Sequence, residues 1–127
     1  IVSRTIEHMK ASNWDRSIGG LYRYPLHLQP WPEHPFGGPW VTYTSWLGGV
    51  HLLRGERERA ADCIQWVLDQ LPDDSHLIAE HFSIQHIGRR GFARIYLDPA
   101  TPEVWATAEF LRLVMRYATL APAGSMA

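Results

Sequence analysis

The 127-residue chain has a single cysteine, Cys63, almost no net charge and no long apolar run. One cysteine excludes an internal disulfide, and its place in an apolar helical pattern predicts a small buried side chain rather than a nucleophile. A net charge of −1 provides no basic field that would attract phosphates, so we expect no nucleic acid partner. No stretch approaches the roughly 18 apolar residues of a membrane span, and the first residues lack a signal-peptide pattern. We therefore expect a cytoplasmic protein that does not contact a membrane.

The seven histidines do not form a pattern that is typical of a metal site. His76, His81 and His86 follow one another at intervals of five residues, whereas two ligands on one helical face are usually four apart. We expect that the chain binds neither a metal nor a cofactor.

Apolar residues recur at helical spacing in four stretches, which predict helices near residues 1–12, 40–54, 57–71 and 102–120. The stretches 13–39 and 76–98 are rich in proline and glycine or irregular, and we expect two long loops gathered at one end. A turn at Gly55 would make the middle helices an antiparallel pair. The fold class expected is all-α, with antiparallel helix pairs in one segment over residues 1–127.

Two details of these helices can be tested by a structure. Gly48 and Gly49 each cost a helix interior about 1 kcal/mol relative to alanine, which predicts close packing by another helix or a local irregularity. For the last helix, Thr101 is a possible cap and Pro102 a possible first residue, with Glu103 near the positive end. Its expected buried stripe consists of Val104, Ala108, Leu111, Val114, Met115 and Ala118.

The segments 18–25 and 36–40 combine glycines, aromatic residues and one arginine. Gly19 and Gly20 can adopt positive φ and allow a close approach of the backbone to a ligand. Arg23 offers planar donors, and flat rings are expected from Tyr22, Tyr24 and Trp40. Sugars bind to such a mixture, because a pyranose has an apolar face and a rim of hydroxyls. The alternative interpretation is a loop whose aromatic residues cap a core.

Glu80 is the only acidic residue between Asp74 and Asp98. It lies in an apolar run, and an apolar environment raises the pKa of a carboxyl group toward values useful for a general base or acid. The alternative is a structural glutamate that is hydrogen-bonded within the fold.

Several motifs in this chain occur in a defined order: Gly19-Gly-Leu-Tyr-Arg-Tyr-Pro25, Phe36-Gly-Gly-Pro-Trp40 leading into Thr44-Ser-Trp-Leu47, Leu77-Ile-Ala-Glu80, and Val104-Trp-Ala-Thr-Ala-Glu-Phe-Leu-Arg-Leu-Val114. Together they resemble the C-terminal part of the glucoamylase-like glycoside hydrolases of family fifteen. The catalytic domain of that family is an (α/α)6 barrel, so the resemblance implies a partial (α/α)6 barrel, roughly its last third. Around Glu80 the family usually has Pro-Glu-Gln, where this chain has Ala79-Glu80-His81.

The resemblance implies an inverting hydrolysis of α-linked glucosides by two carboxylic acids. Glu80 matches the family's general base, while Arg23, Tyr24 and Trp40 match substrate-binding positions. No residue here matches the general acid. The expected partners are an α-glucoside or oligosaccharide, together with the remainder of the barrel or a second copy of the chain. The alternative is a noncatalytic helical module that binds a carbohydrate or a partner chain through the loop of Trp31 and Trp40.

Overall fold

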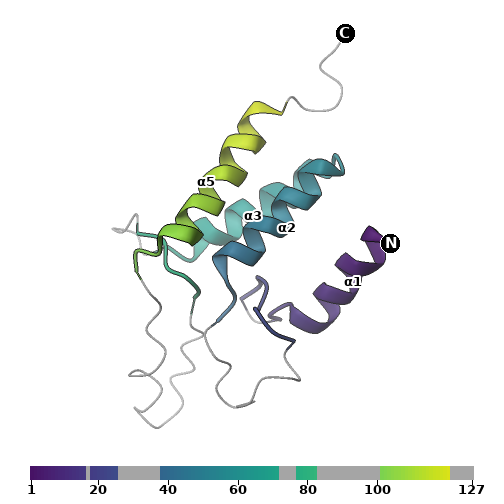
Figure 1. Ribbon diagram of the computed structural model, residues 1–127, viewed down its shortest axis with the longest axis horizontal. Coiled ribbons are helices and arrows are strands. Elements are labelled where there is room, and N and C mark those ends of the chain that lie inside the picture. Colours follow the sequence, from purple (N-terminus) through teal and green to yellow (C-terminus); the bar gives the residue numbers. More distant parts are fainter. Residues whose placement is uncertain (17, 26–37, 72–76, 83–100, 121–127) are drawn as a thin grey trace.

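The computed structural model describes residues 1–16, 18–25, 38–71, 77–82 and 101–120. This part of the chain contains helices and no strand (Figure 1); the helices are α1 Val2–Asn13, α2 Val41–Leu53, α3 Arg57–Asp69 and α5 Val104–Thr119. These bounds lie within two residues of the predicted ones, and the all-α class is confirmed. None of the helices described is long and apolar enough to cross a membrane.

Several sequence-based expectations concern residues outside those ranges. They include most of the two predicted loops, with Trp31, Phe36, His76 and His86.

α2 lies between the other helices and packs against both α3 and α5. The chain reverses after α2 at Gly55, whose φ of 73° is readily adopted by glycine. At the start of α3, Arg57 Nη1 donates to the Leu120 carbonyl at 2.7 Å, and its guanidinium carbon lies 3.8 Å from the centre of the Tyr117 ring. The first residue of α3 thus meets the end of α5. α3 is therefore antiparallel to α2, as predicted, and also to α5, whereas α2 and α5 run in the same direction (Figure 1).

Both α3 and α5 pack closely against α2 at Gly48. A Cβ at Gly48 would lie 2.7 Å from Leu113 Cδ2 on α5 and 3.0 Å from Cys63 Cβ on α3. The close packing predicted from this glycine is confirmed. Gly49 differs, because a Cβ there would meet no atom within 4 Å. Cys63 is buried as expected, and burial raises the pKa of its thiol to about 12, so the side chain remains protonated near neutral pH.

The buried side of α5 is not the predicted one. Ala106, Phe110 and Leu113 face the core. Of the stripe expected to be buried, Val114 packs partly buried against the core, but Val104 is 80% exposed, Leu111 52% and Met115 67%. The prediction was wrong because α5 has apolar residues at helical spacing on two sides, and periodicity alone does not determine which side is covered.

The start of α5 also differs from the prediction. The carboxylate of Glu103 accepts a hydrogen bond from the Ala106 N–H, which makes Glu103 the N-cap of a helix that begins at Val104. Thr101 and Pro102 therefore precede the helix. The sequence suggested only that Glu103 lies near the positive end of the helix dipole. A carboxylate in this position can also accept a hydrogen bond from a free N–H group of the first turn.

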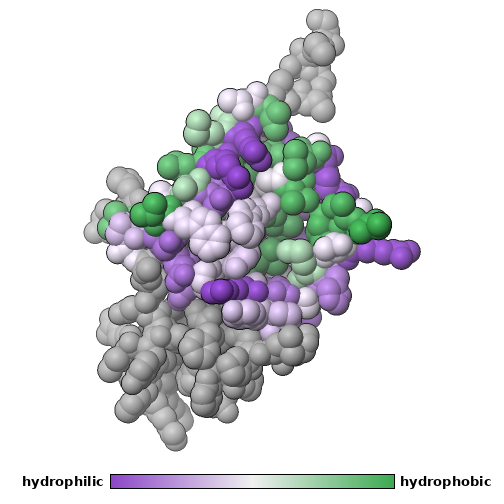
Figure 2. All heavy atoms as spheres, in the orientation of Figure 1, coloured by the Kyte–Doolittle hydropathy of each residue, from purple (hydrophilic) through white to green (hydrophobic). Residues whose placement is uncertain are grey.

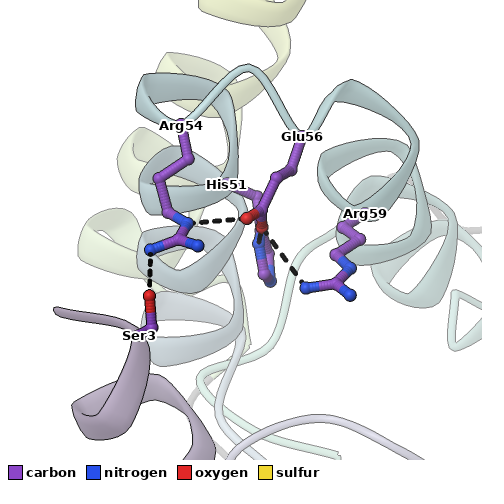
Figure 3. A network of polar contacts seen from close by, with 5 residues as sticks. All are labelled: Ser3, His51, Arg54, Glu56 and Arg59. Carbon is purple, nitrogen blue, oxygen red and sulfur yellow. Dashed lines mark hydrogen bonds and ion pairs between the residues drawn. The ribbon is translucent and has the colours of Figure 1, made fainter.

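A polar network holds the turn between α2 and α3 and attaches α1 to it (Figure 3). Glu56 Oε2 lies 2.6 Å from Nδ1 of the buried His51, and Glu56 Oε1 accepts from Arg54 Nε at 2.7 Å. Arg59 approaches the same carboxylate at 3.5 Å, and Arg54 Nη1 donates to Ser3 Oγ of α1 at 3.0 Å. The hydrogen bonds from Arg54 and His51 lower the pKa of Glu56 to about 2. The carboxylate is therefore ionised at neutral pH.

At the opposite end of α2, backbone hydrogen bonds join the ends of both loops. The Trp40 N–H donates to the Leu21 carbonyl at 2.8 Å, and the Val41 N–H donates to the Glu80 carbonyl at 3.2 Å. Phe82 N–H in turn donates to the carbonyl of Pro39 at 3.1 Å. These bonds place the segments 20–22, 38–41 and 78–82 side by side at the start of α2.

Candidate functional site

Gly19 and Gly20 have positive φ values of 79° and 85°, as the sequence suggested. Their close contact, however, is with the protein rather than with a ligand. A Cβ at Gly20 would overlap Trp66 Cζ2 and lie 2.7 Å from Pro39 Cβ. Trp66 Nε1 also donates to the Ile18 carbonyl at 2.8 Å. The expectation that these glycines admit a ligand is corrected: they make room for the indole of Trp66, which α3 carries.

Tyr22 is buried and does not offer a free ring, contrary to the expectation. Its hydroxyl donates to Asp15 Oδ2 at 2.8 Å, and Asp15 Oδ1 accepts from the Ile18 N–H at 2.8 Å. Burial, and then the hydrogen bond to Asp15, raise the pKa of Tyr22 far above its usual range. Tyr22 and Asp15 thus stabilise the loop. No local pattern in the sequence singled out Asp15 as the partner.

Arg23, Tyr24 and Trp40, the predicted substrate-binding residues, come together at the start of α2. The guanidinium carbon of Arg23 lies 5.2 Å from the centres of both the Tyr24 ring and the Trp40 ring. Trp40 is only 8% exposed, whereas Tyr24 is 52% exposed. A cation within about 6 Å of an aromatic ring is attracted to its face. Trp40 therefore positions the Arg23 guanidinium, and the surface open to a ligand consists of Arg23 and Tyr24.

His81 links the two loops at this place and was not identified as a site residue from the sequence. Its ring lies 5.8 Å from that of Trp40, and its Nδ1 accepts from the Gly38 N–H at 3.2 Å. Burial lowers the pKa of His81, which favours the neutral ring. With Nδ1 as an acceptor, the proton of the neutral ring is on Nε2. The signal that could have identified it is its position directly after Glu80.

Glu80 lies beside these residues through its backbone. Its carbonyl accepts from Val41, next to Trp40, and the following residue is the His81 that contacts the Trp40 ring. The side chain is partly exposed. Within the described ranges, no hydrogen bond or ion pair holds its carboxylate. A carboxylate that is fixed by its main chain and free at its oxygens can accept a proton from a bound water.

A row of aromatic side chains extends from Trp40 along α2. The ring centres are 5.6 Å apart for Trp40 and Tyr43 and 5.4 Å apart for Tyr43 and Trp46. The row crosses to α5 at Trp105, whose ring centre is 5.7 Å from that of Trp46. Trp46 and Trp105 are 40% and 44% exposed. Together with Tyr24, the row supplies flat and partly open rings over two helices.

The described residues contain no group of three or more histidine, cysteine or acidic side chains that could hold a metal ion. No protein-family model, curated protein or solved structure matches the chain. The inference on function therefore depends on the ordered motifs and on the contacts at the start of α2.

Proposed function

We propose that this chain is the C-terminal part of a glucoamylase-like glycoside hydrolase, that its helices belong to an (α/α)6 barrel, and that it acts on α-linked glucosides. One observation carries the proposal. Residues of three separate motifs, with Arg23 and Tyr24 in the first, Trp40 in the second and Glu80 in the third, gather at the N-terminal end of α2. This is the clustering that a site shared by those motifs requires.

In the proposed reaction, Glu80 is the general base of an inverting hydrolysis. Its carboxylate takes a proton from a water that attacks the anomeric carbon opposite the leaving group. A general acid from another part of the barrel protonates the departing oxygen, and the two carboxyl groups are about 6.5–9.5 Å apart in such enzymes. Arg23 donates to sugar hydroxyls, and Tyr24 contacts the apolar face of the ring. His81 and Trp40 position these groups without contacting the substrate.

Exposed apolar residues on the outer face of α5 favour the proposal that another helix or chain packs against this segment. Val104, Leu111 and Met115 are each more than half exposed, and a large apolar patch on a soluble protein usually marks a contact surface. Further helices of the barrel or a second copy of the chain would cover this face.

The catalytic role is tested by Glu80→Gln in the assembly that releases glucose from an α-glucoside. The substitution keeps the shape of the side chain but removes the proton acceptor, so we expect the rate to fall by about 10²–10⁴ with sugar binding largely retained. Glu58→Gln, on the exposed first turn of α3, is the matched control and should have no effect. Arg23→Ala should weaken binding and rate together. Unchanged hydrolysis in Glu80→Gln would instead favour a noncatalytic module that binds carbohydrate.

A further inference from the structure

A cavity of about 260 Å³ lies between α2 and α5, away from the site at the start of α2. Trp46 and Gly49 line it from α2, and Glu109, Arg112 and Arg116 line it from α5. α3 lies behind these two helices in Figure 1, and Figure 2 shows the face formed by α2 and α5. There, pale side chains occupy the space between the two helices, with hydrophilic groups beside them along α5.

Gly49 borders the cavity without contributing a side chain to it. A Cβ on this residue would meet no atom within 4 Å, although its neighbour Gly48 is tightly enclosed. Packing between helices therefore explains Gly48 and does not explain Gly49. A glycine in a helix interior is unfavourable unless something requires the space. The open space beside Gly49 is suited to a ligand.

The polar groups of the cavity are not fully used within the protein. Ser45 lines the cavity and is only 3% exposed, yet its hydroxyl has no hydrogen-bond partner among the described residues. A buried hydroxyl without a partner is unusual in native structures. Glu109, with a side chain 16% exposed, lies 2.5 Å from Arg112 Nη2. A ligand that carries hydroxyl groups could pair with Ser45 and bridge the carboxylate and the guanidinium.

The aromatic part of the cavity favours a ring-shaped ligand. Trp46 is 40% exposed and is held edge-to-face against Trp105 at 5.7 Å. A purely apolar ligand would leave the Ser45 hydroxyl unpaired, and an isolated phosphate would face the Glu109 carboxylate that pairs with Arg112. A neutral sugar has both the apolar face that fits the indole and the hydroxyls that fit the polar groups.

We propose that the cavity between α2 and α5 is a second sugar-binding subsite, which stacks one glycosyl unit on Trp46 and hydrogen-bonds it through Ser45, Glu109 and Arg112. The class of sugar rests on the proposed function, but the site requires neither Glu80 nor hydrolysis. Trp46 follows Trp40 by six residues, or about 9 Å along the helix. An oligosaccharide that follows the aromatic row can therefore reach both sites, and longer α-glucans should bind more tightly than a single glucoside.

Maltoheptaose and methyl α-glucoside are the probes, titrated into the full chain while the indole N–H resonances of its tryptophans are recorded by NMR. Replacement of Trp46 and Trp105 by phenylalanine, one at a time, assigns their signals. We expect both signals to shift with maltoheptaose. Gly49→Leu should fill the cavity and weaken this response at least tenfold, whereas Gly49→Ala should retain it. Glu109→Gln, which preserves the shape of the side chain, should weaken it about tenfold because a hydrogen bond to a charged group is lost.

Arg23→Ala separates this subsite from the proposed active site. The proposal is supported if the Trp46 and Trp105 shifts persist in Arg23→Ala and disappear in Gly49→Leu. Shifts that disappear in Arg23→Ala and persist in Gly49→Leu would leave the first site standing and overturn the subsite. A wild-type chain without any shift would overturn the subsite and the sugar specificity together. If sedimentation shows that Gly49→Leu converts an associated form of the chain into a monomer, the cavity between α2 and α5 is part of a protein interface and the proposal is wrong.

Discussion

The neighbouring glycines of α2 permit a direct test of how the three central helices pack. Gly48→Ala and Gly49→Ala change the same helix by one methyl group each. Helix propensity alone should raise the free energy of unfolding of each variant by about 1 kcal/mol, because alanine is favoured over glycine inside a helix by that amount. The new methyl group meets different surroundings. At Gly48 it would lie 2.7 Å from Leu113 Cδ2, whereas at Gly49 it would have no neighbour within 4 Å.

The magnitude depends on how far Leu113 can move away from Gly48. Leu113 is only 2% exposed and borders the cavity between α2 and α5, so its methyl group can yield only toward that space. Overpacking of a core typically costs about 1–3 kcal/mol. Subtracting the gain in helix propensity leaves Gly48→Ala about 0–2 kcal/mol less stable than wild type, while Gly49→Ala is about 1 kcal/mol more stable. At about 4 °C per kcal/mol for a chain of this size, the two melting temperatures should differ by roughly 4–12 °C.

Urea unfolding followed by far-ultraviolet circular dichroism measures both variants. A second comparison isolates the contact with Leu113. In a Leu113→Ala background only Cys63 Cβ remains close to the new methyl group, at 3.0 Å, so Gly48→Ala should be less destabilising than in the wild-type background. The packing described for α2 would be refuted if Gly48→Ala were as stable as Gly49→Ala in the wild-type background. The same result would remove the reason for treating the space at Gly49 as special.

Three further predictions concern protonation and association. Burial lowers the pKa of His81 below 6.5, so below about pH 6.5 the unfolded chain binds a proton more readily than the folded chain. The free energy of unfolding should therefore fall as the pH drops below about 6.5. In His81→Gln, unfolding titrations should show a weaker dependence of this free energy on pH. The pKa of Glu56 is lowered from 4.5 to about 2 by Arg54 and His51, so its contribution to stability is present above pH 4.5 and is lost as the pH falls through about 2; acid titration of Glu56→Gln should lack this loss. Met115→Glu, on the outer face of α5, should reduce self-association in sedimentation without unfolding the chain, and unchanged association would show that this face is not the contact.

The helices could be predicted because their signals are local. Apolar spacing and the glycine at position 55 define where α2 ends and where α3 begins, and neither depends on distant contacts. The tight packing at Gly48 could also be anticipated, because an unfavourable residue in a helix needs a tertiary reason. The orientation of α5 could not be predicted in the same way. Both Leu111 and Leu113 belong to apolar series, and Leu113 is covered because α5 packs against α2 and α3 on that side.

The candidate site was predictable in part. The ordered motifs predicted that Arg23 and Trp40 belong to the same site, and the structure places the Arg23 guanidinium over the Trp40 ring. The role of Gly20 was missed because its constraint comes from Trp66, which lies 46 residues further along the chain. A contact of this kind leaves no local pattern. For the same reason, the pairing of Asp15 with a buried tyrosine became evident only from the folded chain.

The backbone around Glu80 is fixed at the start of α2, while within the part of the chain that the structure describes no contact holds its carboxylate oxygens. Val41 binds the Glu80 carbonyl, and the His81 ring accepts from Gly38 and lies against Trp40. These contacts fix the main chain on both sides of Glu80 without using its side chain. The proposed role of Glu80 as a general base therefore requires none of these backbone contacts to be broken before its carboxylate meets a water.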